Sequence, residues 1–142
     1  MKTVKHLLST KSVQIFSITE HSSVLDALKL MMEKNISALL VMEEQELKGI
    51  FTERDYARKI ILHGKSSAET SVQEVMTAAP ITVLPSDTIE FCMSIMTDKH
   101  IRHLPVMEKD QLLGMVSIGD LVKFIIEDQK QTISQLENYI TS

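Results

Sequence analysis

A polar motif occurs twice in the chain: a glycine begins an apolar strand, a hydroxyl residue ends it, and an aspartate follows three positions later. The two copies are Gly49-Ile50-Phe51-Thr52-Glu53-Arg54-Asp55 and Gly114-Met115-Val116-Ser117-Ile118-Gly119-Asp120. An aspartate one turn inside a helix can accept hydrogen bonds from two adjacent ribose hydroxyls. The helix start also carries unpaired N–H groups and the positive end of the dipole, which suit a phosphate. The motif therefore predicts two sites for a sugar or a phosphate.

The same residues also fit a purely structural role. Ser/Thr-x-x-Asp resembles a capping box, in which the hydroxyl and the carboxylate bond to free backbone N–H groups at the helix start. The glycine of each motif would let another group approach the strand closely. Capping and ligand binding can use the same side chains, so both interpretations of Asp55 and Asp120 stay open.

The two motifs belong to a longer internal repeat at an offset of 65 residues. Residues 15–63 and 80–128 align without a gap and are identical at 12 of 49 positions. A period above 50 residues is too long for most solenoid units. We therefore expect one duplicated domain whose halves pack on each other.

Each copy predicts the order strand, helix, strand, strand, helix, which is typical of an α/β (α+β) fold. The first helices carry apolar stripes at Val24, Ala27, Leu28, Met31 and Met32, and at Ile89, Cys92, Met93 and Met96. Ser22 and the pair Asp87 and Glu90 are expected at the starts of these helices. The strands are expected at 38–42, 47–52, 104–107 and 112–117, and the second helices at 53–63 and from 118 onward. Gly64 should end the first of these, and residues 65–71 form a polar linker.

Composition narrows the classes of function. The chain has 142 residues, of which 44% are hydrophobic and 24% charged, and these values indicate a globular protein. The net charge of -4 comes without a basic cluster, which argues against nucleic-acid binding. One cysteine, Cys92, and the lack of a signal peptide or a long apolar run favour a cytoplasmic protein with no membrane segment.

The last residues have no counterpart in the first copy. Ile126, Ile133 and Ile140 lie seven apart with Leu136 between the last two, so residues 129–142 are expected to extend a helix with one apolar seam. Two heptads are too few for a stable free coiled coil. The seam either folds back on its own domain or contacts a second subunit, and the sequence leaves both possibilities open.

The chain resembles a pair of cystathionine-β-synthase (CBS) domains. The resemblance rests on the duplicated Gly-apolar-x-Thr/Ser-x-x-Asp motif, on Val75-Met76-Thr77, and on residues 80–85 of the linker, and it covers about residues 4–128. It implies two tandem repeats, 1–70 and 71–128, packed with pseudo-twofold symmetry, followed by the helical extension 129–142. It also implies a regulatory module, not an enzyme, that requires no cofactor and forms a homodimer.

By this resemblance the ligand is an adenosine compound: AMP, ADP, ATP, NAD or S-adenosylmethionine. Asp55 and Asp120 would bind ribose hydroxyls, and Thr52 and Ser117 ribose or phosphate. Ile50 and Met115 would line the adenine pocket, together with the backbone around Ala38–Leu39 and His103–Leu104. Pro105 fits this picture, because a proline inside an apolar strand marks an edge or a ligand-facing position. Arg54, Arg102 and His103 would contact phosphate. Because these cations have no counterparts in the other copy, we expect unequal sites.

Other polar candidates fit structural roles better. His100 and His103 have an HxxH spacing, but three positions apart in an extended segment they would point to opposite faces, so we expect no zinc site. Cys92 lies on an apolar stripe and is expected in the core. The alternative function is an interaction protein with vestigial clefts that regulates a partner. A nucleotide- or thiol-converting enzyme is a weaker alternative.

Overall fold

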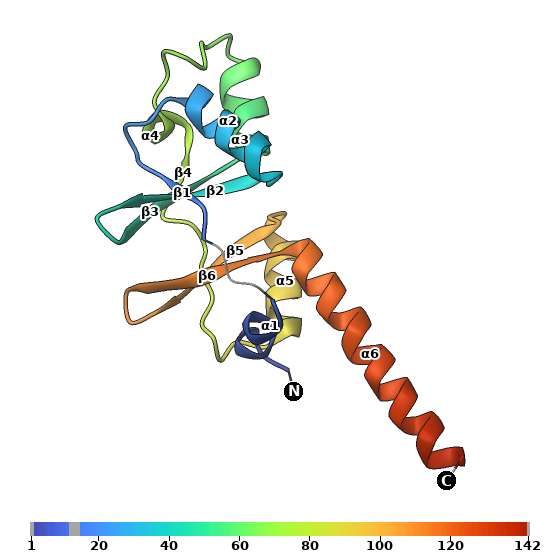
Figure 1. Ribbon diagram of the computed structural model, residues 1–142. Coiled ribbons are helices and arrows are strands. Elements are labelled where there is room, and N and C mark those ends of the chain that lie inside the picture. The colour runs from blue at the N-terminus through green and yellow to red at the C-terminus, as the bar shows by residue number, and fades with distance from the viewer. Residues whose placement is uncertain (1, 12–14, 142) are drawn as a thin grey trace.

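The computed structural model describes residues 2–11 and 15–141. Two sheets face each other with helices on their outer sides, and one long helix projects from the body (Figure 1). The first sheet has the order β1 (Ser17–Ile18), β2 (Ala38–Glu43), β3 (Glu46–Thr52), β4 (Thr77–Ala78), and the second consists of β5 (His103–Glu108) and β6 (Gln111–Ser117). The helices are α1 (Val4–Thr10), α2 (Val24–Lys34), α3 (Glu53–Asp55), π-helical η1 (Tyr56–Ile61), α4 (Val72–Val75), α5 (Ile89–Lys99) and α6 (Ile118–Thr141). The expected α/β fold of two repeats with a C-terminal helix is confirmed.

The duplication is visible in the two antiparallel hairpins, β2–β3 and β5–β6. Each has a register shift at the same place, between Val41 and Met42 and between Val106 and Met107. Each turn has two central residues with positive φ, at positions 44–45 and 109–110. Positive φ at both positions is the geometry of the tight turns that match strand twist.

The first helices begin one residue later than expected. The hydroxyl of Ser23, not Ser22, accepts a hydrogen bond from the N–H of Asp26 and caps α2. Thr88 caps α5 in the same way, and the Asp87 carboxylate instead accepts from the N–H of Leu84. Both caps are therefore hydroxyl residues at matching positions of the repeat.

The prediction that Met32 belongs to the buried stripe of α2 is wrong, because its side chain is 79% exposed. Eight residues after Val24, it lies about 80° around the helix and leaves the buried face. Val24, Ala27 and Met31 are buried as expected.

The second helix of the first copy also differs from the expectation. It is α-helical only over α3 and then continues as η1, where the N–H of Leu62 donates to the carbonyl of Ala57. Apolar periodicity over six residues does not distinguish an α-helix from a π-helix. Gly64 follows with a φ of 65°, as expected for the residue that ends this helix.

The first strand expected in the second copy is reduced to one bridge between Val83 and Val106. Pro80 and Pro85 flank this segment, and proline cannot donate to a strand ladder. A second sheet of only two strands follows from this.

The described residues form three clusters of buried hydrophobic side chains, and in two of them a helix from one repeat's sequence packs in the core of the other repeat. Val4 and Leu7 of α1 pack in the cluster of the second repeat. Val72 and Val75 of α4 pack in the cluster of the first repeat. The third cluster, Ala38, Leu40 and Ile50 with Met42, Leu47, Leu112 and Met115, joins the two sheets. Each repeat is therefore completed by a segment from outside its own sequence copy.

The close pairing of β4 with β3 requires a glycine at position 49. A Cβ at Gly49 would lie 2.7 Å from the Thr77 carbonyl oxygen and 2.8 Å from the sulfur of Met76. The group that approaches this glycine is therefore strand β4, paired through Gly49 and Ala78. Close approach was expected at this glycine, and the chain itself provides it.

We expect Gly49→Ala to lower the free energy of unfolding by about 1–3 kcal/mol, because the new methyl group overlaps the backbone of β4. Gly119→Ala is the matched control: its nearest neighbour would be Ser117 Oγ at 3.7 Å, and alanine should stabilise α6 by up to about 1 kcal/mol. Chemical denaturation at one protein concentration compares the two. Equal stability of both variants would contradict this explanation of Gly49.

Candidate functional site

In the described part of the chain two clefts lie between the repeats, one beside each copy of the Gly-apolar-x-Thr/Ser-x-x-Asp motif. The first cleft, about 680 Å³, is lined by Ile50, Thr52, Arg54 and Asp55 of the first repeat and by His100, Arg102 and His103 of the second, among others. The second cleft, about 370 Å³, is lined by Phe16, Ser37 and Ala38 of the first repeat and by Met115, Ser117 and Asp120 of the second, among others. Ser37 and His103 line both clefts.

Asp55 is 6% exposed, and both of its carboxylate oxygens are bound by protein groups. Oδ2 accepts from the N–H of Thr52 (3.0 Å) and from its hydroxyl (3.1 Å), while Asp55 N–H donates to Thr52 Oγ1 (3.2 Å). Oδ1 accepts from the Thr77 hydroxyl (3.1 Å) and lies 3.1 Å from Lys59 Nζ. The capping box is therefore present, and the carboxylate is saturated.

Asp120 is more open, with 31% of its side chain exposed. Its Oδ2 accepts from the N–H of Ser117 (2.9 Å) and from Lys11 Nζ (2.8 Å), and its own N–H donates to Ser117 Oγ (3.1 Å). Among the residues that the structure describes, none donates a hydrogen bond to Oδ1. This oxygen can accept a bond from a ligand without displacing a protein group.

The cation beside each aspartate has a different origin. Lys59 lies four residues after Asp55 on the same helical segment. The second repeat has Phe124 at the matching position, and Lys11 supplies the charge instead. Lys11 also donates to the Met115 carbonyl (2.9 Å). The spacing of Lys59 from Asp55 could have been found in the sequence, whereas nothing there connects Lys11 to Asp120.

The two clefts also differ in charge. Arg54, Arg58, Lys59 and Arg102 line the first cleft with Glu53 and Asp55, which gives four positive and two negative groups. The second cleft has one positive group, Lys11, and one negative group, Asp120. Arg54 donates to the His100 carbonyl and so links the two repeats. The structure thus brings Arg54 and Arg102 together in one cleft.

His103 lies in the wall between the clefts, with its Nε2 3.2 Å from Ser37 Oγ. Burial lowers the pKa of this imidazole, and the charge of Arg102 acts in the same direction, while Asp120 raises it; the net shift is downward. A neutral imidazole can accept or donate at Nε2 according to its tautomer.

Two of the expected site residues do not line either cleft. Leu104 is fully buried in the core of the second repeat. Pro105 is buried in β5, where it pairs with Met115 and its carbonyl accepts from the N–H of Val83. Its missing N–H therefore lies beside the Val83 bridge and not beside a cleft.

The expected opposite orientation of His100 and His103 is wrong, because both line the first cleft. His100 ends α5 in a left-handed conformation (φ 55°), so the segment is not extended there. No group of three His, Cys, Asp or Glu residues in the described ranges is arranged to hold a metal ion. Cys92 lies in the core as expected, and burial, with the Asp87 charge, raises the pKa of its thiol to about 11.

Lys11 should control the ionisation of Asp120. Burial raises the pKa of Asp120. The hydrogen bonds from Lys11 and Ser117 and the charge of Lys11 together lower this pKa by a larger amount, so the net shift is downward. A lowered pKa stabilises the fold at pH values above the unfolded pKa of about 3.9, and this stability is lost as pH falls through the folded pKa.

We therefore expect Lys11→Met to raise the pKa of Asp120 and to cost about 1 kcal/mol at pH 7. The difference from wild type should shrink as pH falls below about 4, where the carboxylate is protonated in both proteins. Carboxyl NMR titration measures the pKa of Asp120. Chemical denaturation at pH 7 and below about pH 4 measures the free energy of unfolding. Lys5→Met, an exposed change in α1, is the control. An unchanged Asp120 titration in Lys11→Met would contradict the ion pair.

A sequence model of the CBS domain matches residues 4–62 and 72–127. The chain is 43% identical over 127 residues to the mitochondrial CBS domain-containing protein CBSX3 of Arabidopsis thaliana, covering 86% of this chain and 62% of that protein. It is 31% identical over 121 residues to YhcV of Bacillus subtilis, covering 85% and 84%.

Solved structures agree with this assignment. A protein with CBS domains from Burkholderia ambifaria is 47% identical, with a TM-score of 0.87 over 90% of this chain and 96% of that chain. The CBS-domain protein NE2398 is 45% identical, with a TM-score of 0.84 over 88% and 98%. Because both repeats match the family over most of their length and share its fold, the chain belongs to the CBS domain family as a tandem pair.

Proposed function

We propose that this protein is a regulatory module that binds an adenosine-containing ligand in the clefts between its repeats. The observation that carries the proposal is Asp120, whose carboxylate lies at a helix start, lines a cleft and keeps one oxygen without a protein donor among the described residues. A ribose offers two adjacent hydroxyls to such a carboxylate. Ile50 and Met115 offer apolar surface for the base in the first and second clefts.

A relative supports the choice of ligand. CBSX2, which is 22% identical with a TM-score of 0.77, was crystallised in complex with AMP. We carry over only the class of ligand; AMP, ADP, ATP, NAD and S-adenosylmethionine all share the adenosine group.

The cytoplasmic compartment also stays a prediction; among the described residues no helix could span a membrane.

The two clefts should bind unequally. A ribose at Asp55 must displace Thr77 or Lys59 from Oδ1, whereas a ribose at Asp120 need displace nothing from its Oδ1. The first cleft has the larger positive charge and should therefore favour ligands with more phosphates. Arg54, Arg102 and His103 are the residues that we assign to phosphate there.

Regulation would follow if the ligand prefers one relative arrangement of the repeats. A ligand can shift such an equilibrium only by its difference in affinity for the two arrangements. Ser37 and His103 line both clefts and come from different repeats, so they are placed to transmit a change from one cleft to the other. A protein partner would then respond to that arrangement.

We expect Asp120→Ala to weaken adenosine-ligand binding at the second cleft by roughly 10- to 100-fold, because one hydrogen bond to a charged group contributes about 1.5–3 kcal/mol. Calorimetry with AMP, ADP, ATP, NAD and S-adenosylmethionine measures this. Asp98→Ala, an exposed change on α5, is the control. Full affinity in Asp120→Ala and in Asp55→Ala, with lower melting temperatures, would leave capping as the only role of both carboxylates.

Arg102→Gln should weaken ATP more than AMP, by about 10-fold in the ratio of their affinities, because the change removes a charge-assisted bond to phosphate. Lys29→Gln, an exposed change on α2 at a residue that lines neither cleft, is the control. An unchanged ATP-to-AMP ratio would place the phosphates away from Arg102.

The alternative function is an interaction protein whose clefts are vestigial. The saturated carboxylate of Asp55 favours it for the first cleft, because a capping role alone explains that residue. Capture of one regulated partner with equal affinity in the presence and absence of every adenosine ligand would support this alternative.

A further inference from the structure

The two carboxylate oxygens of Asp120 are unequal, because Lys11 binds only one of them. Lys11 follows α1, and its Nζ donates to Asp120 Oδ2 (2.8 Å) and to the Met115 carbonyl oxygen (2.9 Å). The N–H of Ser117 donates to the same Oδ2 at 2.9 Å. A carboxylate oxygen has about two acceptor sites, so Oδ2 is fully occupied. Oδ1 receives no hydrogen bond from any described residue and keeps its acceptor sites for a ligand.

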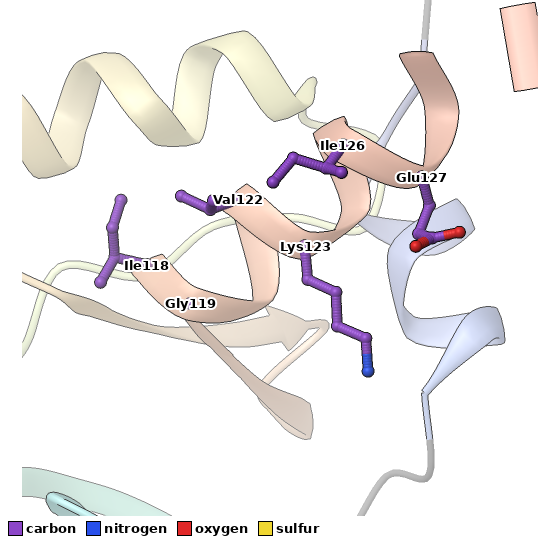
Figure 2. Close-up of a pocket in the computed structure, with 6 residues that line it drawn as sticks. All are labelled: Ile118, Gly119, Val122, Lys123, Ile126 and Glu127. Atoms are coloured by element: carbon purple, nitrogen blue, oxygen red, sulfur yellow. The ribbon is translucent and has the colours of Figure 1, made fainter. Parts of the chain in front are cut away.

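Lys11 is the one cation within the described ranges that forms an ion pair with Asp120. Lys123 is closer to Asp120 in the sequence, about one helical turn further along α6. Figure 2 shows Lys123 among the residues that line a separate hollow of about 420 Å³ on α6, with Ile118 and Val122. These three residues do not line the second cleft. The position of Lys11 therefore decides which oxygen of Asp120 a ligand in that cleft can use.

A ribose binds a carboxylate through both of its adjacent hydroxyls only when both carboxylate oxygens are available. Such a bidentate pair is strongest when each hydroxyl donates to its own oxygen. Hydroxyls on adjacent carbons approach from one side, so they cannot use both lone-pair directions of a single oxygen with good geometry. With Lys11 on Oδ2, Asp120 can accept from a ribose only at Oδ1.

We propose that Lys11 determines the specificity of the second cleft, because it makes Asp120 bind one ribose hydroxyl instead of two. This inference rests on the proposed function and states what the second cleft requires of its ligand. The required ligand is an adenosine compound that presents one particular hydroxyl of the ribose pair. A ligand that lacks the other hydroxyl binds equally well, because Lys11 already occupies the oxygen that this hydroxyl would need.

The first cleft offers an internal comparison, because its aspartate has no acceptor site left. Lys59 Nζ lies 3.1 Å from Asp55 Oδ1, and the Thr77 hydroxyl donates to the same oxygen. The N–H and the hydroxyl of Thr52 both donate to Oδ2. Asp55 therefore reads neither ribose hydroxyl while these bonds are in place. The first cleft should recognise its ligand through the phosphates and the base alone.

The first experiment titrates the wild-type protein with AMP and with its 2′-deoxy and 3′-deoxy forms, and follows binding by NMR. Isotope-labelled methyl groups of Met115 and Ile50 report the second and the first cleft separately, because each residue lines one of the two. At Met115 we expect one deoxy form to bind within about twofold of AMP and the other roughly 10- to 100-fold more weakly, the loss of one hydrogen bond to a charged group. At Ile50 both deoxy forms should bind within about twofold of AMP. Equal affinities of the two deoxy forms at Met115, whether strong or weak, would overturn the proposal.

The second experiment removes the lysine. In Lys11→Met, Oδ2 of Asp120 becomes available to a second hydroxyl, so the deoxy form that wild type tolerates should bind roughly 10-fold more weakly than AMP. Lys123→Met makes the same change about one turn after Asp120, in the separate hollow, and should keep the wild-type pattern. An unchanged ratio of affinities in Lys11→Met, or the same change in Lys123→Met, would overturn the proposal. The wild-type titration decides the question by itself if Lys11→Met does not fold, which circular dichroism checks.

Failure of this inference is distinguishable from failure of the proposed function. If AMP shifts neither the Met115 nor the Ile50 signal, the proposed function and this inference are both wrong. If AMP shifts the Met115 signal and the two deoxy forms bind there with equal affinity, the second cleft still binds a nucleotide and only the role of Lys11 is wrong.

Discussion

The apolar contact between the two sheets determines the rest of the molecule. Ala38, Leu40 and Ile50 of the first sheet meet Leu112 and Met115 of the second. Burial of these side chains holds the strand ends of both repeats side by side, and the clefts lie where those ends meet. Each cleft is therefore lined by residues of both repeats, and any movement of one sheet on the other changes both clefts.

The two repeats hold their helix-start aspartates with different partners. In the first repeat, Lys59 and Thr77 occupy one oxygen of Asp55, which is almost fully buried. In the second repeat, Lys11 binds one oxygen of Asp120 and leaves the other oxygen accessible. Buried carboxylates need hydrogen bonds and a nearby positive charge. Both aspartates meet this requirement. Of the two, only Asp120 keeps an oxygen, Oδ1, to which no described residue donates a hydrogen bond.

Patterns within one element were predicted well from the sequence. The hairpins, the buried stripes of α2 and α5 and the Thr52–Asp55 capping contacts depend on neighbours a few residues apart. Errors arose where local signals were ambiguous: Ser22 and Ser23 both suit a cap, and six residues do not separate η1 from an α-helix. Among the predicted site residues, Leu104 and Pro105 lie next to His103 in the sequence, but only His103 of the three lines a cleft.

The sequence by itself determined the duplication, the order of the elements and the pair of helix-start aspartates, because these follow from local periodicity and from comparison of the chain with itself. Only the tertiary structure decided which segments complete each repeat: α4 and β4 join the first, and α1 with Lys11 joins the second. The physical reason is that such contacts depend on the path of the backbone between distant segments. Lys11 and Asp120 lie 109 positions apart, and no local pattern of charge or hydrophobicity connects them.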